Sequence, residues 1–192
     1  MTNSKFWLCA GALFVPVLAG CGGSSSSRNT SVPIVPQPRS VTAALANGLT
    51  GTLAEDRSAV AVGGTVTYTM TLTNPTSQPV TYLSSFGPGM NTPVGASLTV
   101  FGPSGQVVYP LGAVSLAVGI GPPVTLAPGQ SVTATETVST TRMAGLAVTQ
   151  GYSAAGIYNA SAAFGVTPGT TSSDAHAPAV TATAGPLPVT AQ

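Results

Sequence analysis

The sequence predicts an all-β fold, an antiparallel β-sandwich of about seven to nine short strands. Apolar residues alternate with Thr over short stretches, and 23 glycines and 17 prolines punctuate a chain of 192 residues. No stretch has the apolar periodicity of a helix. Many short strands separated by turn residues are typical of a sandwich.

The strongest strand signal lies in residues 65–73. Every even position is apolar and every odd position is Thr. This alternation places one face of the strand on a core and the other in solvent, and β-branched Thr suits the pleated surface. The pair Gly63-Gly64 precedes the run and Asn74-Pro75 ends it with a turn, so that residues 79–86 can return antiparallel.

Further strands are expected on either side of two turn signals. Gly102-Pro103-Ser104-Gly105 and Ala127-Pro128-Gly129-Gln130 both have turn-forming composition. The additional expected strands are 96–101, 106–109, 124–126, 131–138 and 156–164.

The N-terminus has the pattern of a secretory signal peptide. Lys5 precedes an apolar run over 6–19, which is shorter than the roughly 20 residues that a membrane-spanning helix needs. The run ends in Leu18-Ala19-Gly20-Cys21, which resembles the bacterial lipobox. That resemblance implies cleavage between Gly20 and Cys21 and attachment of a diacylglycerol to the Cys21 thiol. The alternative is a plain signal peptide with an incidental cysteine.

These patterns divide the chain into four parts. Residues 1–20 are the expected signal peptide, and 21–40 are the lipidated cysteine followed by a flexible Ser- and Pro-rich linker. Residues 41–165 are the expected sandwich. Residues 166–192 are rich in Thr, Ala, Pro and Gly, and are expected to be a loose tail in which 179–184 adds an edge strand at most.

Several short motifs follow one another in a characteristic order within residues 49–165. They are the segment 68–82, Gly105-Gln106-Val107-Val108-Tyr109, Leu126-Ala127-Pro128-Gly129-Gln130-Ser131 and Gly156-Ile157-Tyr158. This order resembles the BsuPI-type intracellular proteinase inhibitor family. The resemblance implies an immunoglobulin-like sandwich, and the family name implies proteinase inhibition. No inhibitory motif maps onto this chain, so no reactive-site residue is assigned.

Charge is scarce throughout the chain. Five Lys+Arg and four Asp+Glu make up 5% of the residues, whereas about 25% is usual. So few charges leave no basic patch for nucleic acid. One His and four acids are a thin supply for acid–base catalysis or metal binding. We therefore expect no enzyme activity, no cofactor and no metal site.

The remaining polar candidates have structural interpretations. Glu55-Asp56-Arg57 is expected to be an exposed turn, with a weak cation site as the alternative. Glu136 shares the alternation face of the apolar residues in 131–138, where either pairing with Arg142 or a bulge that turns it outward is expected. His176 falls in the expected tail, where a rigid catalytic geometry is not expected.

The apolar segment 111–123 is expected to be a core strand or a packed loop. Alternatively, it is an exposed loop that presents Leu116, Val118 and Ile120 to a partner protein. Together these features predict a lipid-anchored, extracytoplasmic domain that binds another protein, for which a protease is one option. The alternatives are a proteinase inhibitor and a structural envelope spacer. Gly22, in place of an aspartate after Cys21, favours the outer membrane in a cell with two membranes.

Overall fold

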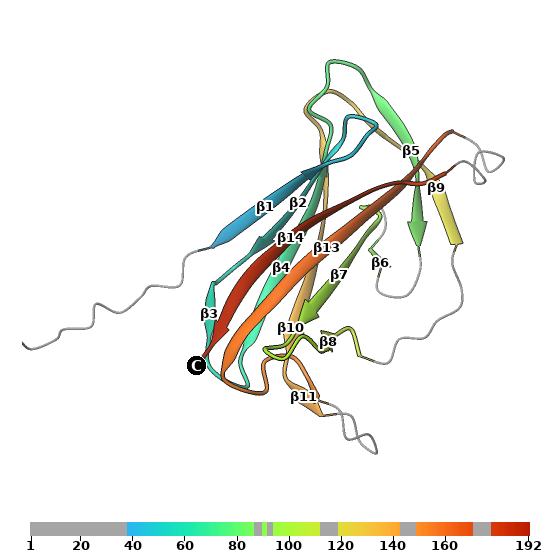
Figure 1. The fold of residues 1–192 in the computed structure, drawn as a ribbon. Coiled ribbons are helices and arrows are strands. Elements are labelled where there is room, and N and C mark those ends of the chain that lie inside the picture. The colour runs from blue at the N-terminus through green and yellow to red at the C-terminus, as the bar shows by residue number, and fades with distance from the viewer. Residues whose placement is uncertain (1–37, 87–89, 92–93, 112–118, 143–148, 171–177) are drawn as a thin grey trace, which may run out of the picture. The chain divides into compact units, whose positions relative to one another are not determined.

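The computed structural model describes residues 38–86, 90–91, 94–111, 119–142, 149–170 and 178–192. These ranges contain fourteen strands and no helix, and they belong to one compact unit, Val35–Gln192. The predicted all-β sandwich is therefore confirmed (Figure 1). Nine of the described strands have six residues or more, and the other five have two or three.

A four-stranded antiparallel sheet forms one layer of the sandwich. Its strands, in spatial order, are β1 (Arg39–Ala44), β2 (Thr50–Glu55), β4 (Thr65–Thr73) and β10 (Ser131–Ser139). Strand β4 has the bounds that the alternation predicted, and its apolar residues are buried while its threonines face outward. Strand β10 follows the same alternation.

The second layer is a larger sheet built around the longest strand. Its main path is β3 (Ala59–Val60), β14 (Val180–Ala191), β13 (Gly156–Pro168), β5 (Val80–Phe86) and β9 (Gly119–Leu126). Three further strands extend it beside β13, namely β7 (Ala96–Phe101), β6 (Met90–Asn91) and β8 (Val107–Tyr109). The short strands β11 (Thr141–Arg142) and β12 (Thr149–Gln150) form a separate ribbon. All pairs are antiparallel except β14 with β3.

The core fills the space between the two sheets. Strand β4 contributes Tyr68, Met70 and Leu72, all fully buried, and β13 contributes Phe164 and other buried residues. The two sheets are in close contact where Phe164 of β13 lies against Gly51 of β2. A Cβ atom at Gly51 would stand only 2.5 Å from the Phe164 ring. Any larger residue at position 51 would therefore push the sheets apart.

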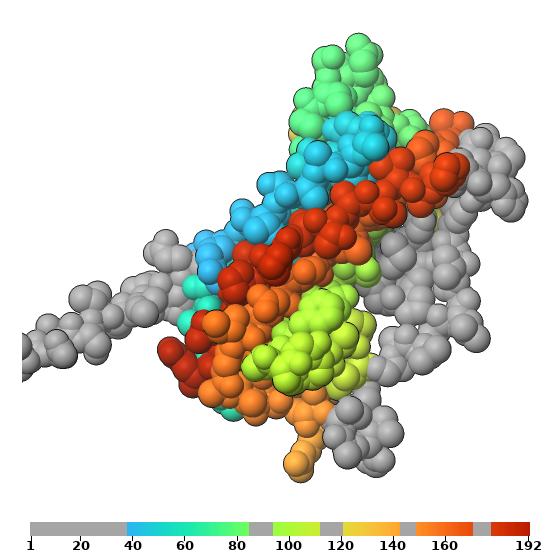
Figure 2. Space-filling model, in the orientation of Figure 1, coloured from blue at the N-terminus to red at the C-terminus, as the bar shows by residue number. Residues whose placement is uncertain are grey.

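Two ends of the domain differ from the sequence-based expectation. The linker was expected to run to residue 40, but β1 begins at Arg39. The expected tail instead forms β14, which pairs with β13 over ten residue pairs and extends well beyond the edge strand expected over 179–184. Figures 1 and 2 show β14 next to β1 along the surface of the molecule. The tail prediction was wrong, because Ala184, Leu187 and Val189 of β14 are buried in the core.

The pairing of β14 with β13 contains a bulge at Gly185 and Pro186. The β13–β14 register shifts between Ala160 and Ala162, so that two residues of β14 face Ser161. One of them, Gly185, has φ of 134°, a conformation that favours glycine, and a Cβ atom there would meet the Ser161 hydroxyl at 2.7 Å.

The contact between Gly51 and Phe164 gives a first prediction. The substitution Gly51→Val should destabilise the domain by about 1–3 kcal/mol, because added methyl groups would overlap the buried ring. Urea unfolding measures the change. The matched control is Thr52→Val on the outward face of the same strand, which should stay within about 0.5 kcal/mol of the unsubstituted chain. Equal stability of the two variants would contradict this account of the core.

Candidate functional site

Few of the candidate sites that the sequence predicts lie within the described residues. Gly20 and Cys21, the expected cleavage and lipidation sites, lie outside them, as do Leu116, Val118 and His176. Ile120 belongs to strand β9, where its backbone pairs with Ser85 of β5. The candidate sites that can be built from side chains are therefore a buried carboxylate, a tyrosine cluster, an open depression and one sheet face.

Glu55 is buried, which corrects the prediction that it lies in an exposed turn. It is the last residue of β2, on the inward face, and is 2% exposed. Its Oε1 accepts a hydrogen bond of 2.9 Å from the Arg39 Nε, and its Oε2 is buried without a hydrogen-bond partner. Arg39 also donates to the Pro188 carbonyl in β14. Arg39 thus joins the two sheets at the start of the domain.

Burial controls the protonation of Glu55. Removal from water raises the pKa of this carboxyl above its usual range, although the hydrogen bond and charge of Arg39 oppose the shift and the charge of Asp56 adds to it. The protonated form of Glu55 is therefore favoured more in the folded chain than in the unfolded chain.

A cluster of three tyrosines lies next to this carboxylate. Tyr68 is opposite Glu55 in the β2–β4 register, and its hydroxyl is 2.6 Å from the hydroxyl of Tyr152. The Tyr152 ring meets Tyr158 edge to face, with ring centroids 4.9 Å apart. The Tyr158 hydroxyl accepts from the Ala154 N–H and donates to the Ala154 carbonyl. Burial raises the pKa of Tyr68 and of Tyr152, so both hydroxyls stay protonated at neutral pH.

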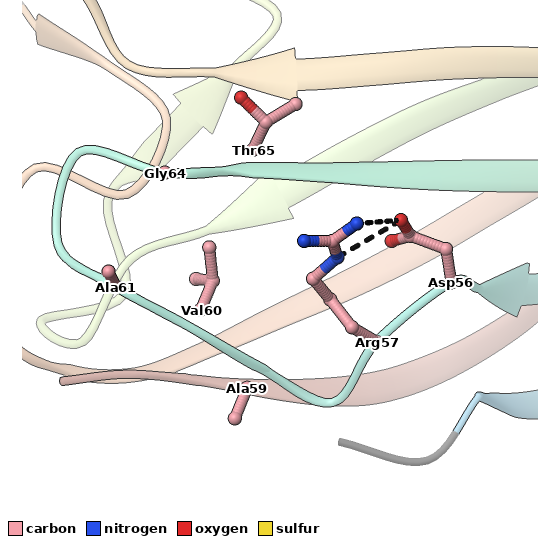
Figure 3. A pocket seen from close by; sticks show the side chains of 7 residues that line it. All are labelled: Asp56, Arg57, Ala59, Val60, Ala61, Gly64 and Thr65. Atoms are coloured by element: carbon pink, nitrogen blue, oxygen red, sulfur yellow. Dashed lines mark hydrogen bonds and ion pairs between the residues drawn. The ribbon is translucent and has the colours of Figure 1, made fainter. Parts of the chain in front are cut away.

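An open depression of about 430 Å³ lies beside the connection between β2 and β4 (Figure 3). Its lining consists of Asp56, Arg57, Ala59, Val60, Ala61, Gly64 and Thr65. Asp56 Oδ2 accepts hydrogen bonds of 3.0 and 2.8 Å from Arg57, and its Oδ1 accepts one from the Thr67 N–H. These bonds secure the connection to β4, so Asp56 and Arg57 have a structural role that accounts for their positions.

Glu136 lies on the inward face of β10, as the alternation predicted. The register between β10 and β4 is unbroken, so the alternative of a bulge that turns Glu136 outward is wrong. Its Oε2 accepts a hydrogen bond of 2.7 Å from the Tyr109 hydroxyl, which comes from β8 in the other sheet. The sequence pattern favours Arg142 as a partner of Glu136, and nothing local in it points to Tyr109, which the structure places there.

The outward face of the four-stranded sheet carries hydroxyl groups and no charge. We call it the hydroxyl face, and it consists of Ser40, Thr42, Ala44, Thr50, Thr52, Ala54, Thr65, Thr67, Thr69, Thr71, Thr73, Ser131, Thr133, Thr135, Thr137 and Ser139. Hydroxyls of β4 and β10 meet across the strands in three pairs. These are Thr73 with Ser131 at 2.8 Å, Thr71 with Thr133 at 3.3 Å, and Thr67 with Thr137 at 3.5 Å. Such pairs stabilise neighbouring strands.

Within the described ranges, no group of three His, Cys, Asp or Glu side chains is placed to hold a metal ion. The same ranges include no helix that is long and apolar enough to cross a membrane. No family model matches the chain, and the search of curated proteins found no match.

The raised pKa of Glu55 predicts how stability changes with pH. Between the ordinary value of 4.5 and the raised value, the folded chain binds more protons than the unfolded chain, so stability should fall as pH rises through this window. Urea unfolding from pH 4.5 to 7 should show this fall in the unsubstituted chain. The fall should be smaller in Glu55→Gln, which has no carboxyl to titrate. An identical pH dependence in both chains would exclude Glu55 as its source.

The tyrosine pair predicts strong coupling between two substitutions. Tyr68→Phe or Tyr152→Phe alone should cost about 1–3 kcal/mol, because each leaves one buried hydroxyl without its partner. The double variant removes both hydroxyls and should be clearly less destabilised than the sum of the single variants. Chemical unfolding of the four chains gives the coupling energy, and simple additivity would count against the hydroxyl pair.

Proposed function

We propose that this chain is a lipid-anchored domain of the bacterial cell envelope that binds another protein through its β-sandwich. The anchor rests on Leu18-Ala19-Gly20-Cys21 at the end of a short apolar run. Where the cell has two membranes, Gly22 favours the outer one. The linker that follows Cys21 would separate the domain from the lipid surface.

Strand β10 is the observation that supports protein binding most directly. It is an edge of the four-stranded sheet, it runs for nine residues, and its register with β4 is regular. Such an edge has backbone N–H and C=O groups that can pair with another strand. By contrast, Glu55, Asp56 and Glu136 each accept hydrogen bonds from other strands of the domain, so these acids serve to join its strands.

Proteinase inhibition is a second candidate, and the motif order of the BsuPI-type family is what favours it. The full chain at micromolar concentration can be assayed against a panel of secreted proteases. Inhibition of one of them would favour this candidate, and no inhibition would leave the binding of another protein as the proposed function. Chemical crosslinking of intact envelopes, followed by identification of the attached proteins, tests that binding. Recovery of no partner would favour an envelope spacer.

The lipid anchor predicts the behaviour of a cysteine variant. In Cys21→Ser, incorporation of labelled fatty acid should be lost, because no thiol remains at the expected attachment site. Cys9→Ser is the matched control, since it changes the other cysteine within the expected signal peptide, and it should label normally. Unchanged labelling of Cys21→Ser would refute the anchor.

A further inference from the structure

The sequence of strand β10 is nearly palindromic. Its sequence is Ser131-Val132-Thr133-Ala134-Thr135-Glu136-Thr137-Val138-Ser139. Around the central Thr135, the two halves mirror each other as Ser, Val and Thr from the ends inward. The pair Ala134 and Glu136 is the exception. A strand with this symmetry can pair with a copy of itself in an antiparallel register and place like residues opposite each other.

The outer edge of β10 has the backbone groups for such pairing. Strand β10 pairs with β4 along its whole length, and no strand in the described ranges pairs with its other edge. Exposed edges are usually protected by proline, lysine, a bulge or an inward-pointing charge. Strand β9, at an edge of the other sheet, contains Pro122 and Pro123 and has a register shift against β5. Strand β10 has no proline, lysine or bulge, and the carboxylate of its one inward-pointing charge, Glu136, is bonded to Tyr109 within the domain.

We propose that β10 is a homotypic interface, through which two copies of this chain pair antiparallel about Thr135. The two four-stranded sheets then form one continuous eight-stranded sheet with twofold symmetry. The inference rests on the proposed function and deepens it, because it names a second copy of the chain as the partner. A twofold interface requires a self-complementary surface, and the mirrored sequence of β10 supplies one.

The outward side of this register repeats pairing that already exists within the domain. Thr133 would face Thr137 of the second copy, and Ser131 would face Ser139. Equivalent hydroxyl pairs join β10 to β4, between Thr71 and Thr133 and between Thr73 and Ser131. The hydroxyl face would therefore continue across the interface without a charge.

On the inward side, this register also places no incompatible side chains opposite each other. Val132 would face Val138, which joins two apolar side chains. Glu136 would face Ala134, so the exception to the mirror symmetry places a small side chain opposite the only charge of the strand. The Glu136 carboxylate keeps its bond to Tyr109 within its own domain. No like charges would stand directly opposite each other.

Disulfide trapping in intact envelopes tests the register. In Thr135→Cys, the new thiols of two copies would be directly opposite, and oxidation should yield a covalent dimer. Thr69→Cys is the matched control, since Thr69 is the neighbour of Thr135 in β4 and lies on the same face. Its counterpart would be three strand spacings away, or about 14 Å, beyond the reach of a disulfide. The unsubstituted chain defines any background from Cys9 and Cys21.

Sedimentation of the purified full chain tests the interface independently. The unsubstituted chain should form a dimer, and Thr135→Lys should raise the dissociation constant at least about tenfold, because two lysines would meet at the symmetry axis. Thr69→Lys should dimerise normally, and thermal unfolding of both variants verifies that they fold. The proposal is overturned if the unsubstituted chain stays monomeric, or if Thr135→Cys forms no more dimer than Thr69→Cys. If another protein is then captured from envelopes, the proposed function stands without the homotypic interface.

Discussion

The packing of Phe164 against Gly51 is the contact on which the rest of the domain depends. It lets β13 of one sheet approach β2 of the other closely enough for the apolar side chains of both layers to fill one core. The chain has few charged residues to solvate its surface. Its solubility therefore depends on strands that bury one apolar face and expose one polar, uncharged face. Apolar residues of β4 are buried in this core, and the threonines between them form the hydroxyl face. The same alternation thus determines both the core and the surface.

The charged residues of the described domain act mainly as connections between strands. Arg39 links Glu55 in β2 to the Pro188 carbonyl in β14, and Glu136 in β10 receives the Tyr109 hydroxyl from β8. In both cases a polar group joins the two sheets. Burial without full pairing has an energetic cost, which appears at Glu55 as one oxygen without a hydrogen bond. These contacts determine how one sheet is placed on the other, while the burial of apolar side chains supplies most of the stability.

Local sequence patterns predicted those strands that are marked by their own alternation or by an adjacent turn. The alternation over 65–73 and the turn at Gly102-Pro103-Ser104-Gly105 were sufficient to place β4 and β7. Of β14, only an edge strand over 179–184 was considered, because its small residues and prolines resemble a tail until β13 is placed beside them. Glu55 was misplaced for a similar reason, since its partner Arg39 is 16 residues away within the expected linker. The Tyr68–Tyr152 pair spans 84 residues, and no local signal indicates it.

The central claim is that β10, which no second strand of the described residues pairs on its outer edge, is available for association through that edge. Amide hydrogen exchange of the full chain, resolved by residue, tests this claim at two protein concentrations. At both concentrations we expect slow exchange in β4, which pairs with β2 and β10, and at the β14 amides that pair with β13. In β10, alternate amides should exchange quickly in dilute solution and slowly in concentrated solution. Exchange in β10 that does not depend on concentration, or rapid exchange throughout β14, would contradict the account.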